Sequence, residues 1–432
     1  MRVGSWGSAP RPHAAVIPLH WRHLPLPSGD GSLLPRGFGR SYGDSCLNEG
    51  GTLLDTRGLD RLIAFDASAG TLACEAGVRL GDILELVLPA GWTLPVLPGT
   101  ANVSVGGAIA NDVHGKNHHV AGTFGHHVER FELLRSDGSR LACSPGENAQ
   151  MFRATIGGLG LTGLITCAEL RLQRAASASF DVQTRAIANL DDFLAASAES
   201  DGRFEYTVAW VDALAGGEHV GRGVFMRANV APAGGEAPPP APAARLAIPF
   251  DLPSGVLNRH AIRMFNRLYR ARATPEWKPS RESHAKFLFP LDAIGHWNRM
   301  YGQRGFFQHQ SVVPRVHAPS AIRDMLVAAA ASADASFLSV LKVFGDREGA
   351  GLISFARPGV TLALDIPMRG PATLALLDRL DAIVRAAGGA IYPAKDAHMS
   401  PETFRRSFPR WSELASHADP AFSSSFWRRV SA

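Results

Sequence analysis

The chain has 432 residues, a net charge of +5, 46% apolar residues and 19% charged residues. That length exceeds the size at which one hydrophobic core usually stops growing, so we expect two domains. The charge is only mildly basic, and no run of Lys and Arg with interleaved aromatics indicates nucleic-acid binding.

Cysteine content and apolar segments bear on the compartment. The four cysteines form no Cys-x-x-Cys pair and no zinc-binding spacing, so reduced thiols and a reducing compartment are expected. The N-terminal residues lack the continuous apolar core of a secretory signal, and no apolar segment approaches the length of a membrane span. We therefore expect a cytoplasmic protein, and attachment to a membrane surface stays open.

Short apolar runs alternate with turns through the first part of the chain and predict a mixed α/β domain. The predicted strands are 52–55, 62–65, 71–74 and 164–172, with a hairpin of 131–135 and 140–143. The predicted helices are 79–89 and 149–156.

The pattern changes near residues 173–178 and predicts a second region of strands and helices. Strands are expected at 204–210, 224–227, 305–313, 339–344 and 361–366, and helices at 321–331 and 372–387. Residues 231–244 are almost all Ala, Pro and Gly, which predicts a loop. A further strand near the chain reversal at 388–396 is expected to carry Tyr392 and Lys395.

Two glycine-rich tracts are the clearest ligand signal. Residues 35–44 hold three glycines beside two arginines, and residues 98–110 form a second tract followed by Asn111–His119. Glycine lets backbone N–H groups approach a ligand closely, and arginines suit a pyrophosphate. Two such loops close together in sequence indicate one large dinucleotide cofactor, and we favour a flavin.

Two other motifs offer competing interpretations. Gly158–Gly163 matches G-x-G-x-x-G, but a helix is predicted before it and a strand after it, which is the reverse of a nicotinamide-binding fingerprint. His114, His118, His119, His126 and His127 could ligate a metal, as in a metal hydrolase. Gly115, Gly122 and Gly125 argue against the helix that such a zinc site normally uses, and nearby acids are scarce, so we expect no metal site.

Polar side chains also interrupt the predicted apolar strands of the second region. Lys342 lies in an otherwise apolar strand, where a lysine needs a partner. Gln308 and Gln310 alternate on one face of another strand, as amides lining a pocket would. On spacing alone, Lys395 is more simply interpreted as a solvated surface lysine.

Eight tracts carry a family resemblance: Arg36–Asp44, Leu97–Thr100, Val105–Ala110, His114–His119, Phe152–Gly163, Gly305–Gln310, Leu341–Phe344 and Tyr392–Asp396. Taken together, they resemble the vanillyl-alcohol-oxidase type of FAD-dependent oxidoreductase. Within that superfamily the chain is most similar to the decaprenylphosphoryl-ribose 2′-oxidases. The resemblance implies an α+β fold, with a PCMH-type FAD-binding domain of two α/β subdomains. The FAD-binding domain would comprise residues 1–177, and the chain would return to it at residues 390–432. Residues 178–389 would form an inserted substrate domain with an antiparallel sheet.

The resemblance also implies site residues. The implied FAD-binding residues are Arg36, Gly37, Phe38, Gly39, Arg40, Ser41, Tyr42, Ser45, Gly99, Thr100, Ser104, Gly106, Gly107, Asn111, His114, Gly115, Asn117, Ile165 and Tyr392. Lys395, Lys342 and Tyr42 are implied as catalytic, and Lys116, Trp210, Gln308, Gln310, Lys342 and Phe344 as substrate-binding. Many relatives attach FAD through a histidine in the first loop, whereas residues 39–42 hold none, so we expect a non-covalent flavin.

The implied reaction oxidises a secondary hydroxyl of a sugar to a ketone, with hydride transfer to flavin N5. A prenyl-phospho-sugar is the implied substrate, with a reductase for the keto product as a candidate partner. A soluble polyol, aldose or aldonolactone is the alternative substrate. The metal hydrolase and a non-catalytic sugar-phosphate-binding protein are alternatives of other classes.

Overall fold

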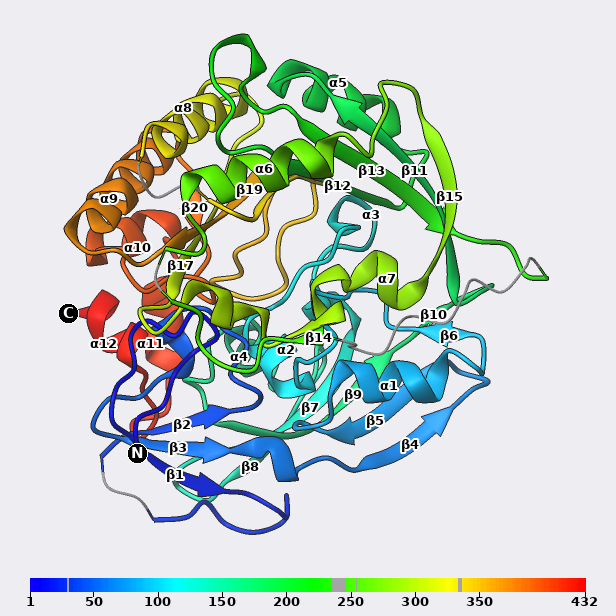
Figure 1. Ribbon diagram of the computed structural model, residues 1–432. Coiled ribbons are helices and arrows are strands. Elements are labelled where there is room, and N and C mark those ends of the chain that lie inside the picture. The colour runs from blue at the N-terminus through cyan, green and yellow to red at the C-terminus, as the bar shows by residue number, and fades with distance from the viewer. Residues whose placement is uncertain (29–30, 235–245, 254, 333–335) are drawn as a thin grey trace.

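The computed structural model describes residues 1–28, 31–234, 246–253, 255–332 and 336–432. Its described strands form three main sheets and two short two-stranded pairs. The two smaller sheets lie together below the largest sheet in the view of Figure 1. No helix among the described residues is long and apolar enough to cross a membrane.

The N-terminal part of the chain builds the two smaller sheets. One is parallel, in the order β1 (Ala15–Pro18), β3 (Thr52–Asp55), β2 (Leu33–Arg36). The other is antiparallel, in the order β4 (Leu62–Asp66), β5 (Thr71–Glu75), β9 (Leu164–Arg171), β7 (Val128–Leu134), β8 (Arg140–Cys143). Short helices lie between these strands: α1 (Leu80–Val87), α2 (Val105–Ala110), α3 (His118–Ala121) and α4 (Ala149–Thr155).

The third sheet has eight strands and is antiparallel throughout. Its order is β15 (Lys278–Ser283), β11 (Ser179–Ile187), β13 (Gly223–Val230), β12 (Tyr206–Val211), β18 (Ser339–Phe344), β19 (Gly359–Pro367), β17 (Phe306–Val313), β20 (Ala390–Ile391). Helices α5 (Leu190–Ser200), α8 (Ala318–Ala331) and α9 (Pro371–Ala386) pack against it and share one apolar core with its central strands. The opposite face of the sheet carries both apolar side chains, such as Trp210 and Val340, and polar ones, such as Gln308, Gln310 and Lys342.

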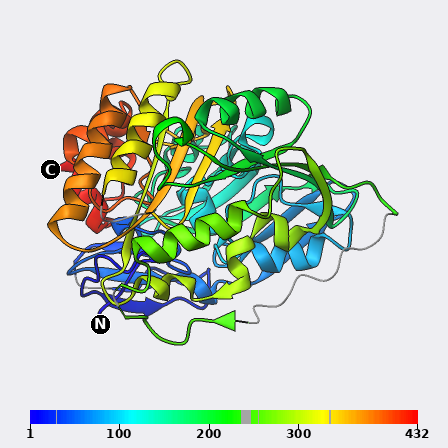
Figure 2. The same cartoon turned by 45° about the horizontal axis from the view of Figure 1, so that its top comes forward.

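Two further helices lie on the near side of the molecule in Figure 1, namely α6 (Arg259–Arg270) and α7 (His284–Leu288). The short pairs are β6 (Trp92–Thr93) with β10 (Gln173–Arg174) and β14 (Leu246–Ala247) with β16 (Ile294–Gly295). In Figure 2 the top of the molecule is turned toward the viewer, and α6 runs across the front.

The chain ends in the helices α10 (Pro401–Ser407), α11 (Trp411–His417) and α12 (Ser425–Ser431), and the segment between α11 and α12 reaches the N-terminal sheet. The amide of Leu33 in β2 donates to Ala421 at 2.7 Å. Arg429 of α12 pairs with Asp44 at 2.8 Å and with Asp396 at 2.9 Å. These buried carboxylates join the end of the first glycine loop to the C-terminal part of the chain.

Most predicted elements occur within a few residues of the expected bounds. The helix α4 before Gly158–Gly163 and the strand β9 after it confirm the order that argued against a nicotinamide site. The strand expected to carry Tyr392 and Lys395 is wrong: β20 ends at Ile391, and a turn follows in which Lys395 N–H donates to Tyr392 at 3.0 Å. Gly389 N–H and Gly388 N–H already bond the end of α9, so little chain remains for a strand. Most of the predicted 231–244 loop lies outside the described residues.

The histidine-rich tract also differs from its prediction. Glycines were expected to prevent a helix there, yet one turn of helix forms as α3, and Phe124–His127 form a 3₁₀ turn. Gly122, at φ +73°, ends α3 in a conformation that side chains rarely adopt. Gly122 therefore terminates a short helix, and Gly125 is accommodated within the 3₁₀ turn.

Candidate active site

A pocket of about 800 Å³ lies between loops of the two smaller sheets and the inner face of the large sheet. The first glycine loop, the loop before α2 and the turn after β20 line one part of it. Side chains of β12, β17, β18 and β19 line another. Its volume is within the range of cofactor and substrate pockets.

The two glycine loops predicted to share one ligand are in direct contact. A Cβ added to Gly37 in the first loop would lie 2.3 Å from Ser104 Oγ in the second. Ser104 caps helix α2 by accepting from Gly107 N–H at 3.2 Å, so its position is held independently. Only glycine at position 37 allows this approach of the loops.

Polar atoms of the first loop are buried there without a described partner. They are Arg36 Nε, Arg40 Nε and Ser45 Oγ. Arg36 donates through Nη2 to Gly4 at 2.8 Å, and the Arg40 guanidinium lies 4.1 Å from the ring centre of Trp6. Buried donors in a native protein are normally satisfied, so these atoms fit an anionic ligand with acceptor oxygens.

Lys395 reaches the same pocket from the turn after β20. Its Nζ lies 3.5 Å from the ring centre of Tyr42, whose amide donates to Ala394 at 2.9 Å. Burial lowers the pKa of Lys395 to about 7, although the carboxyl of Asp365 acts to raise that pKa. A lysine in this state exchanges a proton near neutral pH, as a general base or acid must.

Asp365 is a polar residue that the sequence reasoning missed. Its carboxyl is fully buried on β19, where Oδ1 accepts a short hydrogen bond from Gln308 Nε2 and Oδ2 has no described partner. Burial raises the pKa of Asp365 to about 7. The sequence does contain a sign of this residue. A carboxylate inside the apolar run 361–366 needs a partner, just as Lys342 does in its own apolar strand.

Lys342, His114 and Gln310 form a second cluster. Lys342 Nζ lies 3.2 Å from His114 Nδ1 and 3.4 Å from the carbonyl of Gly115, and Gln310 Nε2 lies 3.2 Å from His114 Nε2. If Gln310 donates to Nε2, Nδ1 carries the imidazole proton and must donate to a neutral Lys342. Burial and the charges of Lys116 and Lys395 lower the pKa of Lys342 to about 7, which is consistent with that pattern.

Lys116 and Trp210 complete the residues assigned to substrate. Lys116 Nζ donates to the carbonyl of Phe287, and burial lowers its pKa to about 8. Trp210 lies on β12, and its buried Nε1–H has no described partner. Three lysines and an indole donor therefore point to an anionic, hydroxyl-bearing ligand.

The pocket gathers nearly all of the residues predicted from the sequence. All of the predicted catalytic, FAD-binding and substrate residues line the pocket except Asn117 and Phe344. Asn117 donates to Pro95 at 2.9 Å, and Phe344 is buried against the rings of His114 and His118. These two side chains support the residues that line the pocket.

Several pocket residues were not predicted. Asp292 accepts from Thr100 Oγ1 at 2.7 Å and from Ala101 N–H at 2.8 Å, tying the second loop to the segment after α7. Phe265 and Tyr269 of α6 pack against Trp210, and Arg272 also lines the pocket. Their sequence neighbourhood carries no recognisable ligand pattern, so only the tertiary contacts reveal them.

Four of the five histidines that suggested a metal make hydrogen-bond contacts within the protein, whereas both ring nitrogens of His118 are buried without a described partner. His119 Nε2 lies 2.9 Å from the carbonyl of Phe204, and His127 Nε2 lies 2.9 Å from that of Ala121. His126 Nδ1 accepts from Thr123 N–H at 3.1 Å. Across the described ranges, no group of three or more His, Cys, Asp or Glu side chains is arranged to hold a metal ion.

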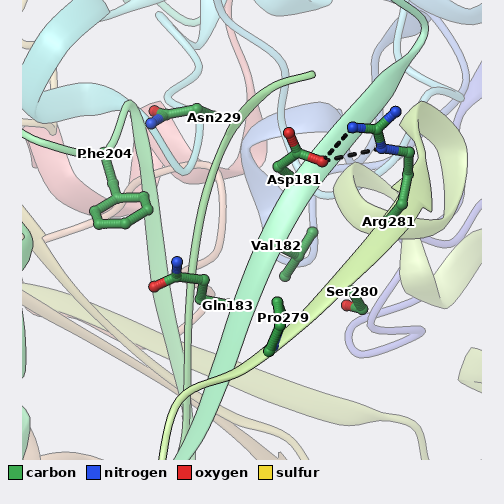
Figure 3. Close-up of a pocket in the computed structure, with 8 residues that line it drawn as sticks. All are labelled: Asp181, Val182, Gln183, Phe204, Asn229, Pro279, Ser280 and Arg281. Atoms are coloured by element: carbon green, nitrogen blue, oxygen red, sulfur yellow. Dashed lines mark hydrogen bonds and ion pairs between the residues drawn. The ribbon is translucent and has the colours of Figure 1, made fainter. Parts of the chain in front are cut away.

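A smaller pocket of about 500 Å³ lies at the edge of the large sheet (Figure 3). It is lined from β11, β13 and β15, and Arg281 bridges to Asp181 at 2.8 Å. None of its lining residues belongs to the predicted site. The charged side chains of this smaller pocket, Asp181 and Arg281, already pair with each other, so the larger pocket is the candidate active site.

Comparison with known proteins identifies this arrangement. Residues 29–144 match the FAD binding domain family. The chain is 36% identical over 422 residues to the decaprenylphosphoryl-β-D-ribose oxidase of Mycolicibacterium smegmatis, covering 93% of this chain and 90% of that protein. The chain belongs to the decaprenylphosphoryl-β-D-ribose oxidase family. It is an FAD-dependent oxidoreductase with a PCMH-type FAD-binding domain and an α+β fold.

Other relatives of the oxidase family mark how far the likeness extends. An uncharacterized protein in the mprA 5′ region of Streptomyces coelicolor is 34% identical over 378 residues, covering 82% of this chain and all of that protein. The Δ24-sterol reductase of Homo sapiens is 33% identical over only 111 residues, covering 26% of this chain and 22% of that protein. The likeness to the first two proteins thus extends over most of this chain, whereas that to the sterol reductase covers about a quarter of it.

The residues present fit FAD. The contact of Gly37 with Ser104 brings two glycine loops to one cavity, and the buried donors of Arg36, Arg40 and Ser45 have acceptors to gain there. The isoalloxazine and the diphosphate both require such main-chain and cationic donors.

Proposed function

We propose that the protein oxidises a secondary hydroxyl of a sugar to a ketone, in the manner of a polyprenyl-phospho-ribose 2′-oxidase. The observation that carries the proposal is the convergence of Lys395, Lys342 and Lys116 in the pocket that fits FAD. A phosphate on the sugar would pair with Lys342 and Lys116 and favour their charged forms, whereas the hydroxyl of the sugar matches a neutral Lys395, whose pKa is about 7. The similarity to an oxidase named for decaprenylphosphoryl ribose supports the same substrate class.

Lys395 is proposed as the group that accepts the hydroxyl proton. FAD, when bound, supplies the acceptor for the hydride that leaves the carbinol carbon. The C–H and O–H bonds break, the C=O bond forms, and the proton stays on Lys395 Nζ. Tyr42 supports the ammonium that results through its ring face, 3.5 Å away.

The remaining side chains are proposed to hold the substrate. Gln308 and Gln310, in adjacent inward positions of β17, would bond sugar hydroxyls, with Asp365 fixing the orientation of Gln308. Lys342, Lys116 and the Trp210 indole would bind the phosphate. Exclusion of water follows from the apolar walls that Phe265, Tyr269 and Trp297 contribute.

We further propose that FAD is held without a covalent bond and that the chain divides at 1–177, 178–389 and 390–432. The absence of histidine from residues 39–42 supports the first point. Hydrogen bonds of Leu33 in β2 with Ala421 and Ser423, between α11 and α12, support the second, although β20 places residues 390–391 in the large sheet. A reductase that consumes the keto product is the proposed partner.

An anaerobic titration tests the proposed function. Adding a prenyl-phospho-ribose to the FAD-loaded protein should bleach the oxidised-flavin absorbance, because electrons stay on the flavin without an acceptor. Parallel titrations with a free pentose, a polyol and an aldonolactone separate the soluble-substrate alternative. Bleaching by those compounds alone, with none by the prenyl-phospho-sugar, would contradict the proposal.

A further inference from the structure

Exposed apolar side chains gather on one short segment of the protein. Six of the fifteen large apolar side chains exposed among the described residues lie between positions 246 and 268. They are Leu246, Phe250, Val256, Met264, Phe265 and Leu268. Single exposed apolar residues need no explanation, but this concentration in one segment does.

Helix α6 presents part of this set in a regular way. Ile262 and Asn266 are buried and form its inner face. Met264 and Leu268 follow each of these by two positions, about 200° around the helix, and are 63% and 58% exposed. The outward side of α6 therefore exposes an apolar pair, Met264 and Leu268, beside polar residues such as Arg267, whereas a helix that simply covers a core would be polar on this side.

The same segment is strongly cationic. Residues 246–272 contain five arginines and one aspartate, and Arg263 and Arg267 are exposed beside Met264 and Leu268. An apolar outward face flanked by arginines has the composition of helices that lie in the interface of an anionic bilayer. Acidic protein surfaces would use the arginines but would leave Met264 and Leu268 in water.

The position of α6 connects this face to the active site. Phe265 and Tyr269 line the pocket, and their rings pack against Trp210. Figures 1 and 2 show α6 crossing the front of the molecule, beside the large sheet. One side of the helix thus faces the pocket while the other faces outward.

We propose that α6 and the described residues before it, 246–253 and 255–258, bind the surface of an anionic lipid bilayer, and that the pocket opens beside this contact. Met264 and Leu268 would enter the interface, and Arg263 and Arg267 would pair with lipid phosphates. Delivery of a polyprenyl-linked sugar from the bilayer rests on the proposed function, whereas binding to the bilayer does not.

Vesicle co-sedimentation of the FAD-loaded full chain tests the proposal. Wild-type protein should sediment with phosphatidylcholine vesicles that contain phosphatidylglycerol and much less with phosphatidylcholine alone, and added salt should weaken binding. Met264→Glu with Leu268→Glu should abolish sedimentation. Arg263→Gln with Arg267→Gln should weaken it about thirtyfold, since each basic residue contributes about fivefold.

Matched controls separate the surface from general effects of the substitutions. Val316→Glu replaces an apolar side chain that is 79% exposed, and Arg405→Gln with Arg406→Gln removes two exposed arginines from α10. Both controls should bind as wild type does. The flavin spectrum and the turnover of a short-chain, water-soluble substrate should remain unchanged in the α6 variants.

Three outcomes would overturn the proposal. One is a wild type that does not bind anionic vesicles, and another is equal loss in the α6 variants and the controls. The third is a wild-type dimer that the α6 substitutions dissociate, which would assign this face to a second copy of the chain. Because sedimentation requires no turnover, a failed oxidation assay leaves the result interpretable.

Discussion

Lys395 shows how burial converts an ordinary side chain into a candidate base. Its pKa falls to about 7 because the pocket desolvates the ammonium, and the carboxyl of Asp365 compensates only in part. The same lysine on the surface would stay charged and could not accept a proton. The chemistry therefore belongs to the position rather than to the residue type.

Lys395→Met should retain FAD and lose substrate-driven reduction. Methionine preserves length but cannot accept the hydroxyl proton, so the reduction rate should fall by about 10²–10⁴. Stopped-flow absorbance of the flavin under anaerobic conditions measures that rate. Lys286→Met, in an exposed lysine of α7, is the control, and an unchanged rate in Lys395→Met would remove Lys395 from the mechanism.

Asp365→Asn should move the acidic limb of the pH–rate profile to lower pH. The carboxyl of Asp365 raises the pKa of Lys395, so its removal lowers that pKa and leaves the lysine neutral at more acidic pH. Asparagine can still accept from Gln308, which separates charge from orientation. The measurement is the flavin-reduction rate against pH, and a profile that stays in place or moves upward contradicts the coupling.

At the scale of elements, the site depends on the meeting of two loops from different sheets. The first loop leaves β2, and the second precedes α2. Asp292 holds the second loop from the segment after α7, and Arg429 holds the end of the first from α12. Each loop is thus positioned by residues that lie far away in the sequence.

Gly37→Ala should weaken FAD binding strongly. The added Cβ would lie 2.3 Å from Ser104 Oγ, and since Ser104 caps α2 the loops must separate. Fluorescence titration of the apoprotein with FAD should show a loss of tenfold or more, if separation removes even one hydrogen bond to a charged group of about 1.5–3 kcal/mol. Gly146→Ala, whose Cβ would meet no atom within 4 Å, should bind FAD as wild type does.

At the scale of the whole molecule, the pocket lies between three sheets, so its ligand should stabilise the complete fold. A ligand that binds only the native state at a hundredfold excess over Kd contributes about 2.7 kcal/mol. Thermal melting of apoprotein against FAD-saturated protein should show this as a concentration-dependent rise in Tm.

Acid precipitation of the FAD-loaded protein should release all flavin into the supernatant, whereas flavin remaining on the precipitate would contradict a non-covalent cofactor.

The amino-acid sequence alone determined the order of elements, the two glycine loops and the cofactor class. These depend on local properties: apolar periodicity, glycine at close approaches and turns, and arginine beside them. For the same reason the order of helix and strand around Gly158–Gly163 could be predicted. The run of family-like tracts then identified the FAD-dependent oxidoreductase fold.

Tertiary structure decided what the side chains do in the site. Lys395 was most simply a surface lysine by spacing, and only the turn after β20 brings it onto Tyr42 and near Asp365. The outward apolar face of α6 likewise needed the burial of Ile262 and Asn266 to be recognised. Proton affinity and exposure depend on neighbours brought together from distant parts of the chain, and local sequence carries no record of those neighbours.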